Sequence, residues 1–149
     1  MTIRKGTPAD VPQLFELVQE LALYEKAPHE VTNTPEQMLK DGFGDNPLFG
    51  VLVAEIENKI VAMSLYYYRY STWKGKRLYL EDIIVNESFR GRGLGKALFD
   101  ATIAEGRQTD CTGMMWQVLD WNEPAIQFYK QFNTRFDTGW WNCHLDFDK

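Results

Sequence analysis

Hydrophobic residues recur at helical spacing in four stretches of the chain. The first stretch follows Thr7 and Pro8, a pair that suits the N-cap and the first position of a helix. Its apolar positions fall every three or four residues, which predicts one buried face. Gly42 and Gly44 are expected to end the second helix at about Asp41. The second, third and fourth predicted helices follow Thr34, the glycine-rich turn at 91–95, and Asn122.

Shorter apolar stretches have the composition of β-strands, and a tight turn is predicted at 57–59 between two of them. The order of elements, βααβββαβαβ, predicts a mixed α/β fold with a mostly antiparallel sheet and helices on both of its faces. Because no linker divides the 149 residues, we predict a single domain over residues 1–149. The predicted strands cover residues 3–4, 49–56, 60–70, 77–85, 114–119 and 140–147.

Composition and charge exclude several classes of function. The net charge of −5 and the lack of a basic patch argue against a nucleic-acid partner and suit a cationic one. No apolar run approaches the roughly 20 residues that cross a bilayer, and the N-terminus lacks an apolar signal segment. We therefore expect a cytoplasmic protein with no membrane partner. Cys111 and Cys143 lack metal-binding spacing, and His29 and His144 are isolated, so no metal is predicted.

Glycines alternate at positions 91, 93 and 95, between a predicted strand and a predicted helix. Glycine lets the backbone approach a ligand closely, and the first N–H groups of a helix have no partner within it. Their partial positive charge favours phosphate or pyrophosphate, and Arg90, Arg92 and Lys96 add formal charge. The turn does not fit the P-loop, which needs serine or threonine after its lysine, because Lys96 is followed by Ala97. It does not fit the dinucleotide fingerprint either, because that motif needs a glycine at position 96.

The motif Arg90-x-x-Gly93-x-Gly95 resembles the acetyl-CoA motif of the GCN5-related (GNAT) acetyltransferases, and the order of elements is similar over nearly the whole chain. The resemblance implies acetyl-CoA as cosubstrate, with its pyrophosphate held by the backbone of residues 91–96. It also implies that the pantetheine lies along residues 83–85 like an added strand. The implied contacts to CoA are Ile83, Ile84, Val85, Arg90, Gly91, Arg92, Gly93, Leu94, Gly95, Lys96, Asn122, Glu123, Pro124 and Ala125.

Glu81 and Asp82 interrupt an otherwise apolar predicted strand. Because adjacent strand residues point to opposite faces, we expect the two carboxylates to lie in different environments, with at least one approaching the interior. A primary amine has a pKa of about 10.4 and must lose a proton before it attacks, and a carboxylate can accept that proton. The pair is therefore a candidate acid–base site. The alternative is a structural role, with one carboxylate in solvent and the other beside a basic side chain.

Longer stretches, at 41–47, 79–82 and 121–130, are similar to the diamine (spermidine/spermine) acetyltransferase group. This resemblance implies that Glu81 is the catalytic base and a substrate contact, that Asp82 binds the substrate cation, and that Tyr129 donates a proton to the leaving thiolate. The pattern alone favours Tyr129 as a core residue, and its phenol could act only as a hydrogen-bond donor. The implied substrate contacts are Tyr24, Glu25, Trp73, Glu81, Asp82, Met115, Trp116 and Gln117.

Ser71-Thr72-Trp73 is similar to the branch of this group that acetylates thialysine. The polyamine-specific members carry an acidic residue and proline before the tryptophan, so the resemblance implies a shorter amino-acid amine. Asn133 stands where relatives often have glycine, and the C-terminal tail is shorter than theirs. Relatives of this group are usually homodimers, which makes a homodimer the expected assembly.

Together these observations predict direct transfer, in a ternary complex, from acetyl-CoA to the primary amine of a small cationic metabolite. The acceptor would be a thialysine-like amino acid, a diamine or a polyamine. A backbone amide near Ile83 would polarise the thioester carbonyl. The alternatives are acetylation of a protein lysine or N-terminus, and a CoA-binding sensor without activity. The presence of both Glu81 and Tyr129 argues against the sensor.

Overall fold

The computed structural model describes residues 1–148, which divide into two compact units, Met1–Gln117 and a second that begins at Val118. The expectation of a single domain over the whole chain stays a prediction. The first unit contains most of the secondary structure. Its elements are β1 (Thr2–Lys5), α1 (Val11–Tyr24), α2 (Pro35–Phe43), β2 (Gly50–Ile56), β3 (Lys59–Ser71), β4 (Gly75–Val85), α3 (Leu94–Gln108) and β5 (Met114–Trp116), with short 3₁₀ turns at Pro8–Asp10, Pro28–Glu30 and Glu87–Phe89.

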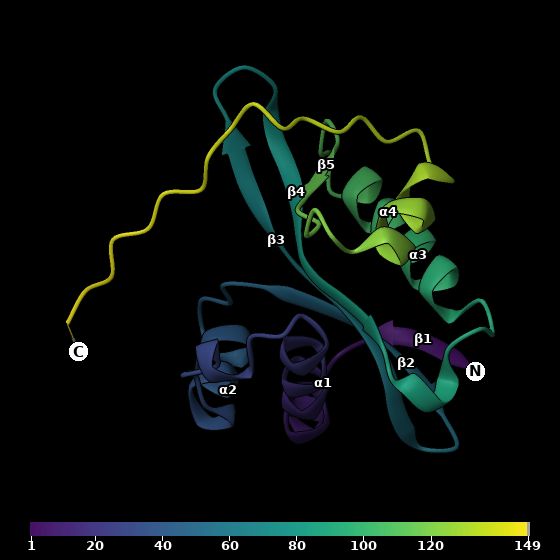
Figure 1. Cartoon of the computed structure of the whole chain (residues 1–149). Coiled ribbons are helices and arrows are strands. Elements are labelled where there is room, and N and C mark those ends of the chain that lie inside the picture. The colour runs from purple at the N-terminus through teal and green to yellow at the C-terminus, as the bar shows by residue number, and fades with distance from the viewer. Residues whose placement is uncertain (149) are drawn as a thin grey trace. The chain divides into compact units, whose positions relative to one another are not determined.

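The five strands form one sheet in the order β1-β2-β3-β4-β5. The first three pairings are antiparallel, and β5 runs parallel to β4. Helices α1 and α2 lie on one face of this sheet and α3 on the other (Figure 1). The predicted mixed α/β fold, with a mostly antiparallel sheet between helices, is confirmed.

Local capping explains where the first two helices begin. The carboxylate of Asp10 accepts hydrogen bonds from Thr7 N at 2.7 Å and from Thr7 Oγ1 at 3.1 Å, which fixes the turn that leads into α1. Thr34 Oγ1 accepts a hydrogen bond from Gln37 N at 3.1 Å and caps α2. Of the two glycines expected to end α2, Gly44 is its C-cap, as predicted, whereas the expectation for Gly42 is wrong, because the helix runs on to Phe43. Gly42 is buried inside its last turn, where a side chain would overlap the ring of Phe49.

The main hydrophobic core of the first unit lies between the sheet and the α1–α2 pair. On the other face, Ser64 of β3 and Thr102 of α3 form a fully buried hydrogen bond of 2.7 Å between their hydroxyl groups. This bond satisfies two buried polar groups and fixes α3 against the sheet. The fully or largely buried residues of the main core are Val11, Leu14, Phe15, Leu17, Met38, Val51, Val53, Ile60, Met63, Leu65 and Ile84.

The second unit contains one helix, α4 (Glu123–Lys130), within its described residues. Asn122 Oδ1 accepts a hydrogen bond from Ala125 N at 3.4 Å, so the predicted cap is confirmed. The predicted closing strand at 140–147 is wrong, because these residues have no strand structure. The strand predicted over 114–119 is also shorter and ends at Trp116.

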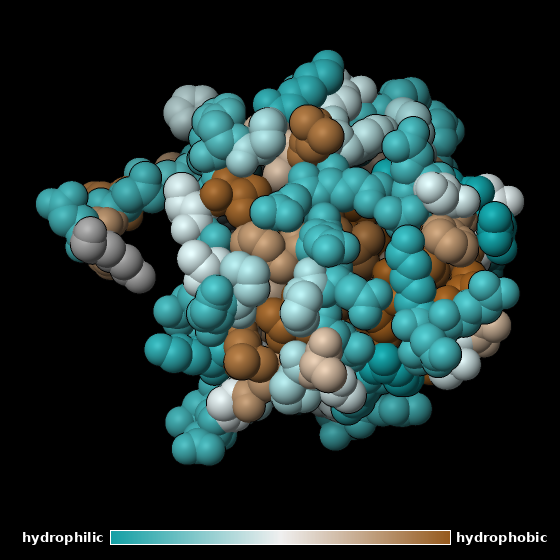
Figure 2. Space-filling view, turned by 90° about the horizontal axis from the view of Figure 1, so that it is seen from below, coloured by the Kyte–Doolittle hydropathy of each residue, from teal (hydrophilic) through white to brown (hydrophobic). Residues whose placement is uncertain are grey.

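One side of the molecular surface is mostly hydrophilic. Figure 2 shows one side, on which polar side chains cover the larger area and hydrophobic ones show between them. Within the described part of the chain, no helix has the combined length and hydropathy that crossing a bilayer demands.

Candidate active site

Strand β4 contains one residue more than its partner β3 at the position of Glu81. Leu65 of β3 pairs with Asp82 and Tyr66 pairs with Leu80, so Glu81 has no partner of its own. Such a β-bulge interrupts the alternation of side chains along a strand. The expectation that Glu81 and Asp82 lie on opposite faces is therefore wrong. Both lie on the face that α1 and α2 cover, where Glu81 accepts a hydrogen bond from Tyr67 and Asp82 lines a cavity with that same tyrosine.

The carboxylates on this face affect one another electrostatically. Burial raises the pKa of Asp82 to about 7, and the negative charges of Glu81 and Glu25 add to the shift. Burial also raises the pKa of Glu25, which caps the C-terminal end of α1. The expectation that one carboxylate of the pair approaches the interior is confirmed by Asp82. Three acidic groups close to one another, one of them half-protonated near neutral pH, form a site suited to a cation.

The cavity beside Asp82 has a volume of about 410 Å³ and opens between the sheet and the α1–α2 pair. Its walls are mainly apolar, with a carboxylate at Asp82 and another at Asp41. A cavity of this composition accommodates a short aliphatic chain that carries positive charge. Its lining residues are Phe15, Val18, Asn33, Met38, Asp41, Leu48, Phe49, Leu65, Tyr67 and Asp82.

An aromatic surface continues from the acidic pair along β3 and β4. Tyr67 donates a hydrogen bond of 2.9 Å to Glu81 Oε1, and its ring stacks on Tyr79 with centroids 5.3 Å apart. The guanidinium carbon of Arg69 lies 5.7 Å from the centroid of Tyr79, and its Nη1 lies 3.1 Å from Met115 Sδ. Tyr67, Tyr79 and Arg69 were not predicted as site residues from the sequence. A signal was available for Tyr67 and Arg69, which follow Leu65 at alternating positions of the same strand, β3. Tyr79 lies on β4 and is brought to them only by the pairing of the two strands.

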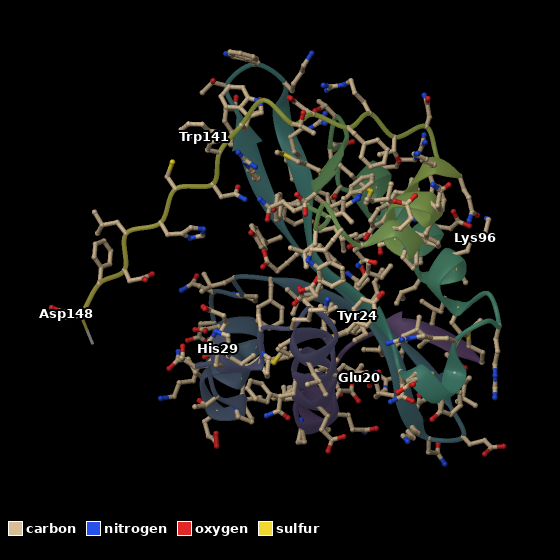
Figure 3. The ribbon with its side chains drawn as sticks, viewed as in Figure 1. Glu20, Tyr24, His29, Lys96, Trp141 and Asp148 are labelled. Atoms are coloured by element: carbon tan, nitrogen blue, oxygen red, sulfur yellow. The ribbon has the colours of Figure 1, made fainter. Side chains whose placement is uncertain are left out.

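Helix α1 brings a further acidic side chain to the segment before α3. Glu20 accepts hydrogen bonds from Asn86 Nδ2 and from Glu87 N, both at 2.9 Å, and its Oε2 lies 3.4 Å from Arg90 Nη2. Arg90 also donates to Val85 O at 2.9 Å, and its guanidinium carbon lies 5.5 Å from the ring of Tyr24. Glu20 was not identified from the sequence. Glu20 and Tyr24 lie one turn apart on α1 (Figure 3), so this helix contacts the segment that leads into the predicted phosphate turn.

The predicted phosphate turn has the conformation that its glycines permit. Gly91 and Gly93 both have φ of 79°, in the left-handed region, and Gly93 is the N-cap of α3. Gly95 already belongs to the helix. Arg92 lies over the ring of Phe89 at 5.0 Å, and Lys96 forms an ion pair of 2.8 Å with Asp100. At Gly91 and Gly93 nothing lies within 4 Å of where a Cβ would stand, so the backbone N–H groups at the start of α3 have open space beside them.

Strands β4 and β5 pair only over Leu78–Leu80 and Met114–Trp116. Within residues 1–117, no strand pairs with that edge of β4 after the bulge. Ile83, Ile84 and Val85, the predicted contacts of the pantetheine, lie in this stretch. Their backbone groups on that edge are thus oriented as an added strand would require.

The remaining predicted substrate contacts are distributed differently. Met115 pairs with Tyr79 and shares its face, whereas the ring of Trp116 packs against Phe99 of α3 at 5.3 Å. Gln117 follows β5, and Trp73, at 83% exposure, lies in the turn between β3 and β4. The structure thus brings Glu25, Glu81, Asp82 and Met115 to one face.

Tyr129 and the predicted CoA contacts Asn122, Glu123, Pro124 and Ala125 belong to the second unit. Inside that unit the ring of Tyr129 contacts Phe128 with centroids 5.5 Å apart, and its carbonyl accepts a hydrogen bond from Thr134 Oγ1. Their predicted roles toward CoA and the thiolate stay predictions. In the part of the chain that the structure describes, no three His, Cys, Asp or Glu side chains are arranged to hold a metal ion.

Comparison with known proteins connects this geometry to a family. The model of the acetyltransferase (GNAT) family matches residues 12–133. A thialysine N-epsilon-acetyltransferase of Mus musculus is 38% identical over 136 residues, which cover 86% of this chain and 80% of that protein. The thialysine N-epsilon-acetyltransferase of Bos taurus is 35% identical over 151 residues, covering 95% and 89%.

A similar fold occurs in a solved structure, a possible acetyltransferase from Clostridium difficile 630. It is 20% identical, with a TM-score of 0.81 and coverage of 98% of both chains. The family model and the two curated relatives confirm the resemblance inferred from the glycine motif, the order of elements and the stretches at 41–47, 79–82 and 121–130. The chain belongs to the acetyltransferase (GNAT) family and is an acetyltransferase.

Proposed function

We propose that the chain transfers an acetyl group from acetyl-CoA to the primary amine of a small cationic metabolite, with a thialysine-like amino acid or a diamine as acceptor. The observation that carries this proposal is the bulge, which brings Glu81 and Asp82 to one face beside an apolar cavity. The similarity to proteins named thialysine N-epsilon-acetyltransferase supports an amino-acid amine as the acceptor.

Glu81 and Asp82 have different roles toward the acceptor: one accepts its proton and the other binds its ammonium group. Glu81 is exposed and oriented by the hydrogen bond from Tyr67, so it can accept the proton that the acceptor ammonium must lose. Asp82 is more buried and lies against the cavity, where its negative charge can hold the ammonium before deprotonation. Glu25 adds negative charge from the end of α1.

Acetyl-CoA, when bound, supplies the thioester that the amine attacks. Two features of the chain suit it: the left-handed glycines before α3 and the unpaired edge of β4 after Leu80. The first fits a pyrophosphate, since backbone N–H groups bind anions at a helix start. The second fits a pantetheine amide chain, since such a chain can hydrogen-bond to a strand edge. An amide near Ile83 then polarises the thioester carbonyl.

The proposal includes direct transfer in a ternary complex, with Tyr129 of the second unit donating to the departing thiolate. It also includes a homodimeric assembly and a cytoplasmic location, both expected from the sequence resemblance and composition. Tyr129→Phe tests the donor role, because loss of the basic limb of the pH–rate profile would support it. An unchanged rate and profile would remove Tyr129 from the mechanism.

The function is tested by measuring acetyl-CoA turnover against thialysine, lysine, ornithine, putrescine, spermidine and a lysine-containing peptide. Turnover of the free amino acids or diamines above that of the peptide is expected. Turnover of the peptide alone would favour a protein acetyltransferase. Binding of CoA without any turnover would replace the proposal with a sensor function.

A further inference from the structure

The face that holds the acidic pair also carries an isolated positive charge. Arg69 lies two residues beyond Tyr67 on β3, and alternate residues of a strand point to the same face. Its side chain is exposed, and within the first unit, residues 1–117, no carboxylate lies within ion-pair distance of it. Its one side-chain hydrogen-bond contact is the thioether of Met115, which is a weak acceptor. The remaining donors of this exposed guanidinium face solvent and can exchange water for a ligand's acceptor atoms.

Two tyrosine rings separate this cation from the acids. The ring of Tyr79 lies beside the guanidinium of Arg69, and the ring of Tyr67 stacks on Tyr79 and hydrogen-bonds to Glu81. Burial raises the pKa of Tyr67 and the bond to Glu81 adds to this, whereas the charge of Arg69 acts in the opposite direction. The electrostatic potential along this surface is thus negative near Glu81 and positive near Arg69.

The spacing of the two charges matches a particular class of molecule. Glu81 follows Tyr79 by two residues on β4, and the guanidinium of Arg69 lies on the other side of that ring, so the charges are on the order of 10 Å apart. An extended amino acid of ornithine or lysine length, with a hydrogen bond at each end, has about this length. Its side-chain ammonium would lie at the acids, its methylenes on the tyrosine rings, and its carboxylate at Arg69.

We propose that Arg69 is the specificity-determining residue that binds the α-carboxylate of an amino-acid acceptor and disfavours diamines. A guanidinium binds a carboxylate through paired, charge-assisted hydrogen bonds. The same guanidinium repels the second ammonium of a diamine. This inference rests on the proposed function and narrows its acceptor to a zwitterion.

The test uses pairs of acceptors that differ only in the carboxylate, ornithine against putrescine and lysine against cadaverine. For Arg69→Met, the ratio of kcat/KM for ornithine to that for putrescine should fall about 10–100-fold, as loss of a charge-assisted bond predicts. The fall should appear mainly in KM, with kcat/KM for putrescine rising because the repelling charge is gone. Arg69→Glu should move the ratio further in the same direction.

Lys76→Met is the matched control. It removes the same charge from the neighbouring strand, but Lys76 contacts Tyr68 and the carbonyl of Thr109 on the face of α3. An unchanged ratio in Arg69→Met, or an equal fall in Lys76→Met, would overturn the inference while leaving the proposed function intact. Wild-type protein that acetylates neither these four amines nor thialysine would overturn both, and that result is visible before any variant is made.

Discussion

Glu20 Oε2 lies 3.4 Å from Arg90 Nη2, although the two residues are 70 positions apart in the chain. The same carboxylate accepts hydrogen bonds from Asn86 Nδ2 and Glu87 N. Glu20 therefore connects α1, which ends at the acidic acceptor face, to the segment that precedes the phosphate turn. A helix remote in sequence therefore contacts the segment that leads into the turn.

Replacement of Glu20 should weaken binding of acetyl-CoA more than it affects the chemical step. Glu20→Gln removes the charge that holds Arg90, and a partly exposed charge-assisted contact contributes about 1 kcal/mol, so KM for acetyl-CoA should rise roughly fivefold with kcat little changed. Steady-state kinetics with acetyl-CoA varied at saturating amine measures this. Glu16→Gln, at an exposed position of the same helix, is the control. Equal KM values for the two variants would refute the coupling.

Gly93 should resist substitution more than its neighbour Gly95. With φ of 79° at Gly93, an added Cβ strains the backbone by roughly 1–2 kcal/mol. Gly95 lies inside α3, where alanine is the better helix former by about 1 kcal/mol. Thermal unfolding should therefore show a lower Tm for Gly93→Ala and an unchanged or higher Tm for Gly95→Ala. The reverse order of the two Tm values would contradict the assigned turn geometry.

Removal of the carboxylate at Glu81 should reduce activity strongly without unfolding the protein. Glu81 is exposed on a bulge, so Glu81→Gln should leave Tm nearly unchanged. Loss of a general base typically lowers the rate about 100-fold or more, and kcat/KM for the amine at neutral pH should fall by that amount. Tyr67→Phe removes only the hydrogen bond to Glu81 and should have a smaller effect. An active Glu81→Gln enzyme would mean that the proton leaves by another route.

The raised pKa of Asp82 predicts a pH dependence of stability with a definite sign. Burial, with the charges of Glu81 and Glu25, disfavours the ionised carboxylate in the folded protein. The protonated form of Asp82 therefore stabilises the folded protein fully below about pH 4, and this stabilisation is lost as the pH rises from about 4 through about 7. Asp82→Asn cannot ionise, so it should be roughly 2 kcal/mol more stable than wild type at pH 8, with no such gain at pH 4. Denaturant unfolding at the two pH values measures the difference.

The same titration should appear in acceptor binding. Wild-type KM for the amine should decrease as the pH rises through about 7, because Asp82 then gains the charge that attracts the ammonium. The decrease should be absent in Asp82→Asn. A KM profile that is identical in the two proteins would show that Asp82 does not hold the acceptor.

Features that depend on a few adjacent residues could be predicted from the sequence. The caps at Thr34 and Asn122 and the start of α3 at the glycine turn are local, since each needs one side chain or one backbone conformation. Gly42 was misjudged because its role depends on Phe49, which packs against it from the next segment. The strand expected at 140–147 failed for a related reason, because composition permits a strand and only a pairing partner forms one.

The candidate site was predictable in its chemistry and less so in its geometry. A pair of carboxylates within an apolar strand was sufficient to single out Glu81 and Asp82. Their common face was not predictable, because a bulge is a property of two paired strands and period-two alternation gives the opposite answer. Arg69 and Tyr67 were missed because their importance comes from neighbours on β4 and not from their own sequence context.

The rest of β4 keeps its alternation as though Glu81 were absent. Leu80 faces α3 and Asp82 faces α1, which is the arrangement that two directly joined strand residues would have. A β3–β4 hairpin that lacked Glu81 would retain every core position on both sides of the bulge. Gain or loss of a single codon could therefore separate an acetyltransferase from a binding protein of the same architecture, with no change to the remainder of the fold.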